Sequence, residues 1–184
     1  NLDRSLDDSL RLATLMRTLN FLSKPTIARV NGSAYGGGVG LVACCDIAIG
    51  VPEAKFGLTE SKLGLLPAVI SPYVIAAIGP RHARRLFATA EIFDAGEAQR
   101  IGLLHDVANP TALDTAVRKQ IDLLLKAGPV PAAGAKALVQ RVVVNEGDMD
   151  AANADLIAKL RVSPEGQEGI QAFLDKRKPA WTQA

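Results

Sequence analysis

The sequence has few residues that could stabilise a protein through disulfides or metal ions. Its only two cysteines, Cys44 and Cys45, are adjacent, and neighbouring residues rarely reach disulfide geometry or form a two-thiolate metal site. Its two histidines, His82 and His105, have no partner at metal-ligand spacing. We therefore expect no metal site and no disulfide, and we place the protein in a reducing compartment, the cytoplasm.

Aromatic residues, long apolar runs and concentrated charge are also scarce. Aromatic residues make up 4% of the chain, the formal net charge is +2, and no long lysine or arginine run occurs. No apolar run approaches the length of a membrane span, and no basic-then-apolar leader opens the sequence. These features argue against a nucleic-acid surface and a membrane partner. The 184 residues, 48% of them hydrophobic, suffice for one substantial core.

The hydrophobic pattern changes character near residue 60. Before it, leucines at helical steps from Leu2 to Leu22 predict a helix that stops at Lys24-Pro25, and a strand, a small apolar helix and two more strands follow. After it, nearly every segment has helical periodicity. The expected strands are 26–32, with a turn signal in its last two residues, 46–51, 54–58 and a short one within 103–108. The expected helices are 39–45, 67–79, 81–90, 94–102, 109–125, about 131–144 and one from Ser163 onward. Asp94, with Glu97 three residues later, and Ser163 are the expected N-terminal caps of their helices. This pattern predicts one α/β domain with a helical C-terminal part.

Three consecutive glycines, Gly36 to Gly38, precede the small apolar helix. They could serve only a tight turn and close packing. They could begin a dinucleotide fingerprint, since Gly38 to Ala43 matches G-x-G-x-x-A with Glu60 as a ribose-binding acid. Two features count against the dinucleotide fingerprint. The strand ends near Val30, which leaves a loop before Gly38 where the motif needs a turn directly after the strand. The dinucleotide-binding fold also needs further strands alternating with helices, and the later chain has mainly helices. The third interpretation, an oxyanion hole, is the one we favour.

An oxyanion hole needs unpaired amides and a group that transfers protons. Glycines at a helix N-terminus expose backbone N–H groups, with the positive end of the helix dipole behind them, to an oxygen that becomes negative. Glu60, in a loop after a short strand, is the candidate general acid and base. Its other interpretation is a helix-start glutamate that interacts favourably with the dipole.

Four ordered segments together resemble the crotonase, or enoyl-CoA hydratase/isomerase, superfamily. They are KPTIARVNGSAYGGGVGLVACCDIAI, AKFGLTESKLGLLP, AIGPRHARRLFATAEIFDAGEAQRIGLL and FLDKRK. The resemblance implies an α/β spiral of ββα units, a helical C-terminal region that builds trimers or hexamers, and acyl-CoA thioester substrates with no further cofactor. We expect residues 1–184 to form a single such domain that lacks its N-terminal part, with the spiral core over about 1–108 and the helical region over about 109–184.

The resemblance implies a role for each of two residues: the backbone amide of Gly37 binds the thioester oxygen, and the Glu60 carboxylate transfers the proton. The second donor of the family's hole would lie upstream of this sequence. Phe173 and Lys176 would contact the CoA of a neighbouring subunit, although a basic end of a solvated helix explains Lys176 equally well when it is taken alone. The remaining substrate-binding residues expected on this basis are Gly36, Gly38, Gly40, Leu66 and Pro67.

The sequence departs from the family's best-known hydratases at Gly40. Those enzymes carry a second glutamate there, two residues after the glycine triplet, whereas only Glu60 is kept here. With one carboxylate, either Glu60 activates water alone, as in a hydratase, or it moves a proton between two carbons, as in a Δ3,Δ2-enoyl-CoA isomerase. A non-catalytic acyl-CoA-binding member is a further alternative.

We favour the hydratase on the resemblance of two segments, YGGGVGLVACCDIAIG and LGLLPAVISPYVIAAIG, to hydratases of 3-substituted glutaconyl-CoA thioesters. That branch serves the breakdown of leucine and acyclic terpenes.

Two other features of the sequence receive less weight as functional sites. The basic cluster Arg81, His82, Arg84 and Arg85 could touch CoA phosphates or a substrate carboxylate but is better explained as a solvated helix face. Asp46 is expected to be a structural hydrogen-bonding residue.

Overall fold

The computed structural model describes residues 2–145 and 147–182, which form two compact units. The first unit comprises the chain up to Leu22 together with Thr26–Arg118, and the second comprises Ser23–Pro25 and the chain from Lys119 onward. The boundary lies inside helix α5 (Leu113–Leu124), beyond residue 109, where the sequence places the start of the helical region. The organisation as one domain stays a prediction.

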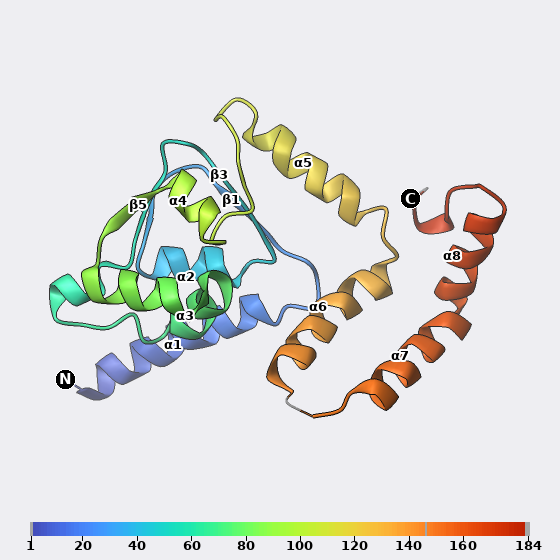
Figure 1. Ribbon diagram of the computed structural model, residues 1–184, viewed down its shortest axis with the longest axis horizontal. Helices are drawn as coiled ribbons and strands as arrows, with labels where there is room; N and C mark the ends of the chain where they lie inside the picture. The colour runs from blue at the N-terminus through green and yellow to red at the C-terminus, as the bar shows by residue number, and fades with distance from the viewer. Residues whose placement is uncertain (1, 146, 183–184) are drawn as a thin grey trace. The chain divides into compact units, whose positions relative to one another are not determined.

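The first unit alternates short strands with helices (Figure 1). Its elements are α1 (Leu2–Asn20), β1 (Ile27–Val30), β2 (Ala34–Tyr35), α2 (Gly37–Cys44), β3 (Ile47–Gly50), β4 (Lys55–Gly57), the 3-10 helix η1 (Thr59–Leu63), α3 (Ser71–Thr89), β5 (Ile92–Asp94), α4 (Ala95–Arg100), β6 (Asp106–Val107) and the first part of α5.

The strands form two small sheets. One has the order β1-β3-β6 with parallel pairs, and the other has the order β2-β4-β5, in which β2 and β4 are parallel and β4 and β5 antiparallel. Two hydrogen bonds to Asp46 Oδ2, from the Thr26 amide (2.7 Å) and hydroxyl (2.9 Å), join the starts of β1 and β3. This contact gives Asp46 the structural role that the sequence predicts.

Helix α2 lies at the centre of the first unit, where it contacts β1 and β2 as well as α1 and α3 (Figure 1). It contains only small and apolar residues, and Val39, Val42 and Cys44 are buried in it. Met16 of α1, which is fully buried, packs its sulfur 3.7 Å from the Cys44 sulfur. Burying each such side chain contributes roughly 1.5–3 kcal/mol, so packing holds this helix in place rather than intrinsic helix propensity.

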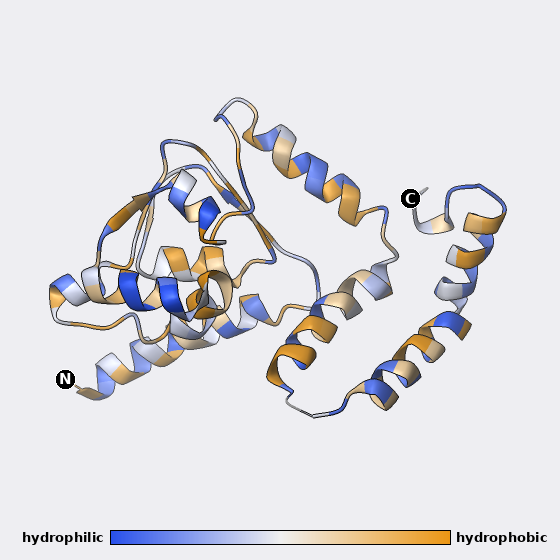
Figure 2. Ribbon diagram, in the orientation of Figure 1, coloured by the Kyte–Doolittle hydropathy of each residue, from blue (hydrophilic) through white to orange (hydrophobic). Residues whose placement is uncertain are grey.

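The second unit contains α6 (Pro129–Val144), α7 (Asp150–Val162), α8 (Pro164–Leu174) and the 3-10 helix η2 (Ala180–Thr182), of which α7 and α8 pack together. Among its described hydrophobic residues only Ala172 is buried. Figure 2 shows strongly hydrophobic residues at the end of α6, where Val143 and Val144 are exposed. Within this unit, therefore, the helices leave much apolar surface uncovered.

Several local predictions are confirmed. The leucine-rich helix is α1, Asp94 caps α4 by accepting a hydrogen bond from the Glu97 amide, and Ser163 caps α8. The break expected between 67–79 and 81–90 is a kink at Gly79 (φ 76°, ψ 159°) inside α3. The two-residue strand β2, strand β5 and helix α7 were not predicted. None of the described helices has the length and apolarity that crossing a membrane requires.

Candidate active site

The candidate site lies where two parallel strands end side by side. Strands β2 and β4 pair with Tyr35 opposite Gly57, and the Gly36 amide donates a hydrogen bond of 2.9 Å to the Gly57 carbonyl. The residues that follow the two strands therefore leave from the same edge. After β2 the chain enters the glycine triplet and α2, and after β4 it enters η1, which carries Glu60.

Helix α2 begins in the glycine triplet, so the first backbone amides carry no side chains of their own. Gly36 precedes the helix with φ 50° and ψ −118°, a conformation that glycine adopts readily. The first helical hydrogen bond joins the Gly40 amide to the Gly36 carbonyl at 3.2 Å, so the amides of residues 37–39 come before the helical ladder. A β-carbon placed on Gly37 would meet no atom within 4 Å. The space beside Gly37 is thus open to a ligand.

Glu60 lies directly against this helix start. A β-carbon placed on Gly36 would lie 3.0 Å from the Glu60 Oε1 atom, so a side chain at this position would crowd the carboxylate. The other carboxylate oxygen, Oε2, is buried and has no hydrogen-bond partner among the described residues. A buried carboxylate oxygen without a donor is costly, and such groups in native proteins call for a functional explanation. The unpartnered oxygen makes Glu60 a candidate functional residue.

The backbone around Glu60 is held by its neighbours. The Ser61 hydroxyl donates a hydrogen bond to the Phe87 carbonyl near the end of α3. Gly64 ends η1 in the left-handed conformation with φ 72°, and the Leu65 amide donates to the Glu60 carbonyl at 3.0 Å. Ser61 is a supporting residue that sequence reasoning missed, because its partner lies 26 residues away and is a backbone carbonyl that carries no sequence signal.

The other predicted substrate-binding residues in this unit are in different environments. Gly38 packs closely on β2, since a β-carbon there would lie 3.4 Å from that of Ala34. Leu66 is 75% exposed, and Pro67 is buried. The side-chain position of Gly40 faces Ile70 and Met16 in the core rather than open space, and its contact with a substrate stays a prediction.

Phe173 and Lys176 belong to the second unit. Phe173 is 82% exposed at the end of α8, and Lys176 follows it in the left-handed conformation with φ 53°. Both side chains are accessible, so they are free to meet a ligand. A contact between them and CoA stays a prediction.

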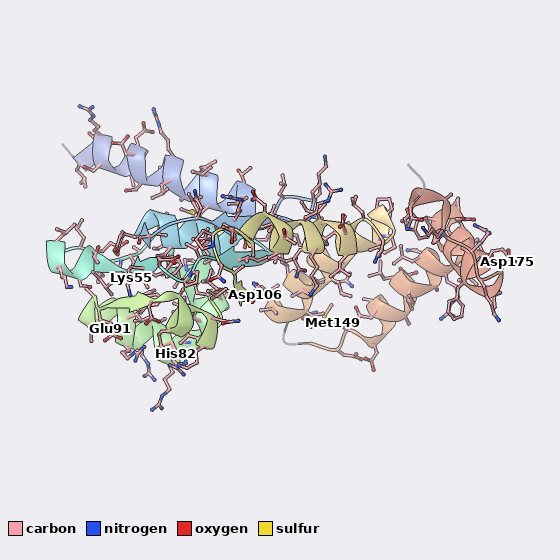
Figure 3. All side chains as sticks on the ribbon, turned by 90° about the horizontal axis from the view of Figure 1, so that it is seen from above. Lys55, His82, Glu91, Asp106, Met149 and Asp175 are labelled. Carbon is pink, nitrogen blue, oxygen red and sulfur yellow. The ribbon has the colours of Figure 1, made fainter. Side chains whose placement is uncertain are left out.

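The basic cluster on α3 is largely a solvated helix face, and nitrogen-tipped side chains extend outward from the helix beside His82 in Figure 3. Arg85 pairs with Glu91 at 3.2 Å and with Glu97 at 2.7 Å. Hydrogen bonds from Arg100, and to a lesser degree from Arg85, hold the pKa of Glu97 at about 2. This network therefore connects α3 to α4 and is structural.

No described residues form a cluster of histidine, cysteine and acidic side chains that could hold a metal ion. His105 has a structural contact, because its Nδ1 accepts a hydrogen bond of 3.0 Å from the Ala48 amide.

A hollow of about 400 Å³ lies beside β1 and α2 and is lined in part by Arg29, Asn31 and Ser33. Its lining includes neither Glu60 nor Gly37, and the Arg29 guanidinium is paired with Asp114 at 2.6 Å.

Comparison with known proteins identifies the kind of protein that this fold and site define. Residues 6–184 match the model of the enoyl-CoA hydratase/isomerase family. Among solved structures, an enoyl-CoA hydratase from Shewanella pealeana superposes with a TM-score of 0.92 at 44% identity, over 98% of this chain and 68% of that one.

The chain belongs to the enoyl-CoA hydratase/isomerase family, and its fold is that of the crotonases, as the sequence predicts. It is 37% identical to the crotonyl-CoA hydratase of Syntrophomonas wolfei, with 89% of this chain and 64% of the relative aligned. It is 31% identical to the mitochondrial methylglutaconyl-CoA hydratase of Mus musculus, over 93% of this chain and 56% of the relative. The chain thus spans less than two thirds of the length of these two relatives.

Proposed function

We propose that this protein adds water across the double bond of an α,β-unsaturated acyl-CoA thioester. The observation that carries the proposal is the Glu60 carboxylate, which lies against the open helix start at Gly36 and Gly37 and has a buried oxygen without a partner. An amide donor and a proton-transfer group on the same face are what enolate chemistry requires.

In the proposed mechanism, the Gly37 amide donates a hydrogen bond to the thioester oxygen and stabilises the negative charge that develops there. Glu60 accepts a proton from water as the water oxygen bonds to the β-carbon and the double-bond electrons move to form the enolate. Glu60 then returns the proton to the α-carbon, which completes a net addition of water. One donor of this kind contributes roughly 3 kcal/mol of transition-state stabilisation.

The second candidate is a Δ3,Δ2-enoyl-CoA isomerase. The observation in its favour is that, among the described residues, Glu60 is the acid found against the helix start, whereas the side-chain position of Gly40 faces Ile70 and Met16. A single carboxylate suffices to take a proton from one carbon and return it to another. Hydration ranks first because the relatives described above are named as hydratases, of crotonyl-CoA in one case and of methylglutaconyl-CoA in another.

We further propose that the second unit mediates assembly into trimers or hexamers. Exposed apolar side chains on its helices support this, among them Val130 (57%), Val144 (79%), Ile157 (53%) and Phe173 (82%). Apolar surface of this kind is typical of surfaces that associate. Light scattering on the purified protein tests the proposal, and a monomeric mass would refute it.

The deciding experiment incubates the protein with crotonyl-CoA, 3-methylglutaconyl-CoA and a 3-enoyl-CoA, separates the thioesters by chromatography against 2-enoyl and 3-enoyl standards, and measures their masses. A product heavier by one water from either of the first two thioesters supports the hydratase. A 2-enoyl product of unchanged mass from the third supports the isomerase. Binding of all three without any product would contradict both activities and support the non-catalytic alternative.

A further inference from the structure

The space beside Gly40 is already filled by a side chain from the start of α3. A β-carbon placed on Gly40 would lie 2.3 Å from Ile70 Cγ2, 2.8 Å from Ile70 Cβ and 3.1 Å from Met16 Cε. Real non-bonded carbon atoms do not approach so closely, because favourable contacts begin at about 3.5 Å. The glycine is therefore required by Ile70, whatever its part in binding.

Ile70 has little freedom to move aside. It is 2% exposed, and its branched β-carbon restricts it to few rotamers. Its backbone is fixed at the N-terminus of α3, where its carbonyl accepts hydrogen bonds from the amides of Tyr73 (3.2 Å) and Val74 (3.1 Å). A side chain at residue 40 would have to displace a stiff, buried residue rather than the flexible end of an exposed one.

Glu60 and Ile70 lie against two glycines at the same end of α2. Gly36 and Gly40 are four residues apart, roughly 6 Å along the axis of α2, and Glu60 lies against the first as Ile70 lies against the second. Side chains on a helix point back toward its N-terminus. A carboxylate at residue 40 would therefore extend toward Glu60 through the volume that Ile70 occupies.

We propose that Ile70 takes the place of a second acid and restricts the active site to one proton-transfer group. This inference rests on the proposed function, since it concerns how many carboxylates act on the acyl-CoA. Glu60 then has to move every proton in the reaction. Replacing Gly40 by glutamate cannot by itself create a two-carboxylate site, because Ile70 has to be removed at the same time.

A stability cycle tests the steric part of the proposal independently of any activity. The variants are Gly40→Ala, Ile70→Gly and the double variant, with melting temperature as the readout. Gly134→Ala is the matched control, since Gly134 is also helical but has no atom within 4 Å of its β-carbon position. We expect Gly40→Ala to melt below the wild type, Gly134→Ala to melt at or above it, and the double variant to lose less than the sum of the single losses. Additive losses, or a wild-type melting temperature for Gly40→Ala, would overturn the proposal.

An activity comparison tests the chemical part. Hydration of crotonyl-CoA is measured for Ile70→Gly and for the Gly40→Glu, Ile70→Gly double variant. A gain of at least about tenfold in the double variant supports the proposal, because a second positioned acid contributes on that scale or more. No gain in a folded double variant would overturn the chemical part. A wild type that converts no thioester would refute the proposed function instead, while the melting cycle would still decide whether Ile70 holds the space.

Discussion

Replacing Gly37 by valine separates the catalytic use of this glycine from its structural use. The β-carbon position of Gly37 has no atom within 4 Å, and its φ lies outside the left-handed range. The free energy of unfolding should therefore change by less than about 1 kcal/mol. The new side chain would occupy the space in which the thioester oxygen has to approach the amide. Loss of one oxyanion donor lowers kcat by roughly a hundredfold to a thousandfold.

The assay measures kcat with the best thioester substrate and the unfolding free energy in urea on the same preparation. Gly134→Val is the control, because it introduces the same side chain at another open helical glycine and should keep the wild-type kcat. In Gly36→Ala, by contrast, both quantities should fall, since φ is 50° and the β-carbon would reach within 3.0 Å of Glu60 Oε1. A normal kcat in Gly37→Val would refute the oxyanion role of Gly37.

Three further predictions concern stability. Asp94→Ala should lower the free energy of unfolding by about 1 kcal/mol in urea titrations, because it removes the cap on the Glu97 amide, and an unchanged value would contradict the capping role. Gly102→Ala should cost more than about 1 kcal/mol in the same assay, since φ is 93° and its β-carbon would lie 2.9 Å from a carbonyl oxygen of α3. The Arg177 hydrogen bonds hold the pKa of Glu168 at about 2, below its ordinary 4.5, so this pair stabilises the fold above pH 4.5 and is lost as pH falls toward 2. In Glu168→Gln, the free energy of unfolding should therefore fall less steeply than in the wild type as pH decreases below 4.5. The same pH dependence in both proteins would refute a stabilising role for this ion pair.

The three glycines of the triplet have three different surroundings. Gly36 has a positive φ and leaves room for the Glu60 carboxylate, Gly37 has open space at its β-carbon position, and Gly38 packs on Ala34. The sequence predicts that these positions need glycine, because a glycine loses more backbone entropy on folding than any other residue. It does not predict which glycine meets which partner, since Glu60 lies on η1, which follows strand β4, and β4 pairs with β2 only in the folded chain.

The regular elements were largely predictable because their signals are local. Leucine periodicity, the Asp94 cap and the Ser163 cap each involve residues within one or two helical turns. Strand β2 has only two residues, Ala34 and Tyr35, and is defined by pairing with β4 rather than by any pattern of its own. Tertiary pairing of this kind is outside the reach of periodicity.

The environment of Gly40 shows the same limit at the candidate site. From the sequence, Gly40 is a position where the family's second acid is missing, and the resemblance predicts that it binds substrate. The structure adds that Ile70, thirty positions later in the chain, fills the space beside it. The local sequence around Gly40 and Ile70 does not predict this contact, because the contact depends on how α3 packs on α2.

The central claim is that Glu60 carries the proton transfer, and the kcat of Glu60→Gln with the preferred thioester tests it most directly. The substitution preserves side-chain shape, so melting temperature and CoA affinity should stay at wild-type values, as they should for the control Glu53→Gln at an exposed glutamate. We predict a fall of at least about a hundredfold in kcat, or roughly 2.7 kcal/mol, for Glu60→Gln alone. A kcat equal to that of the wild type would contradict the account.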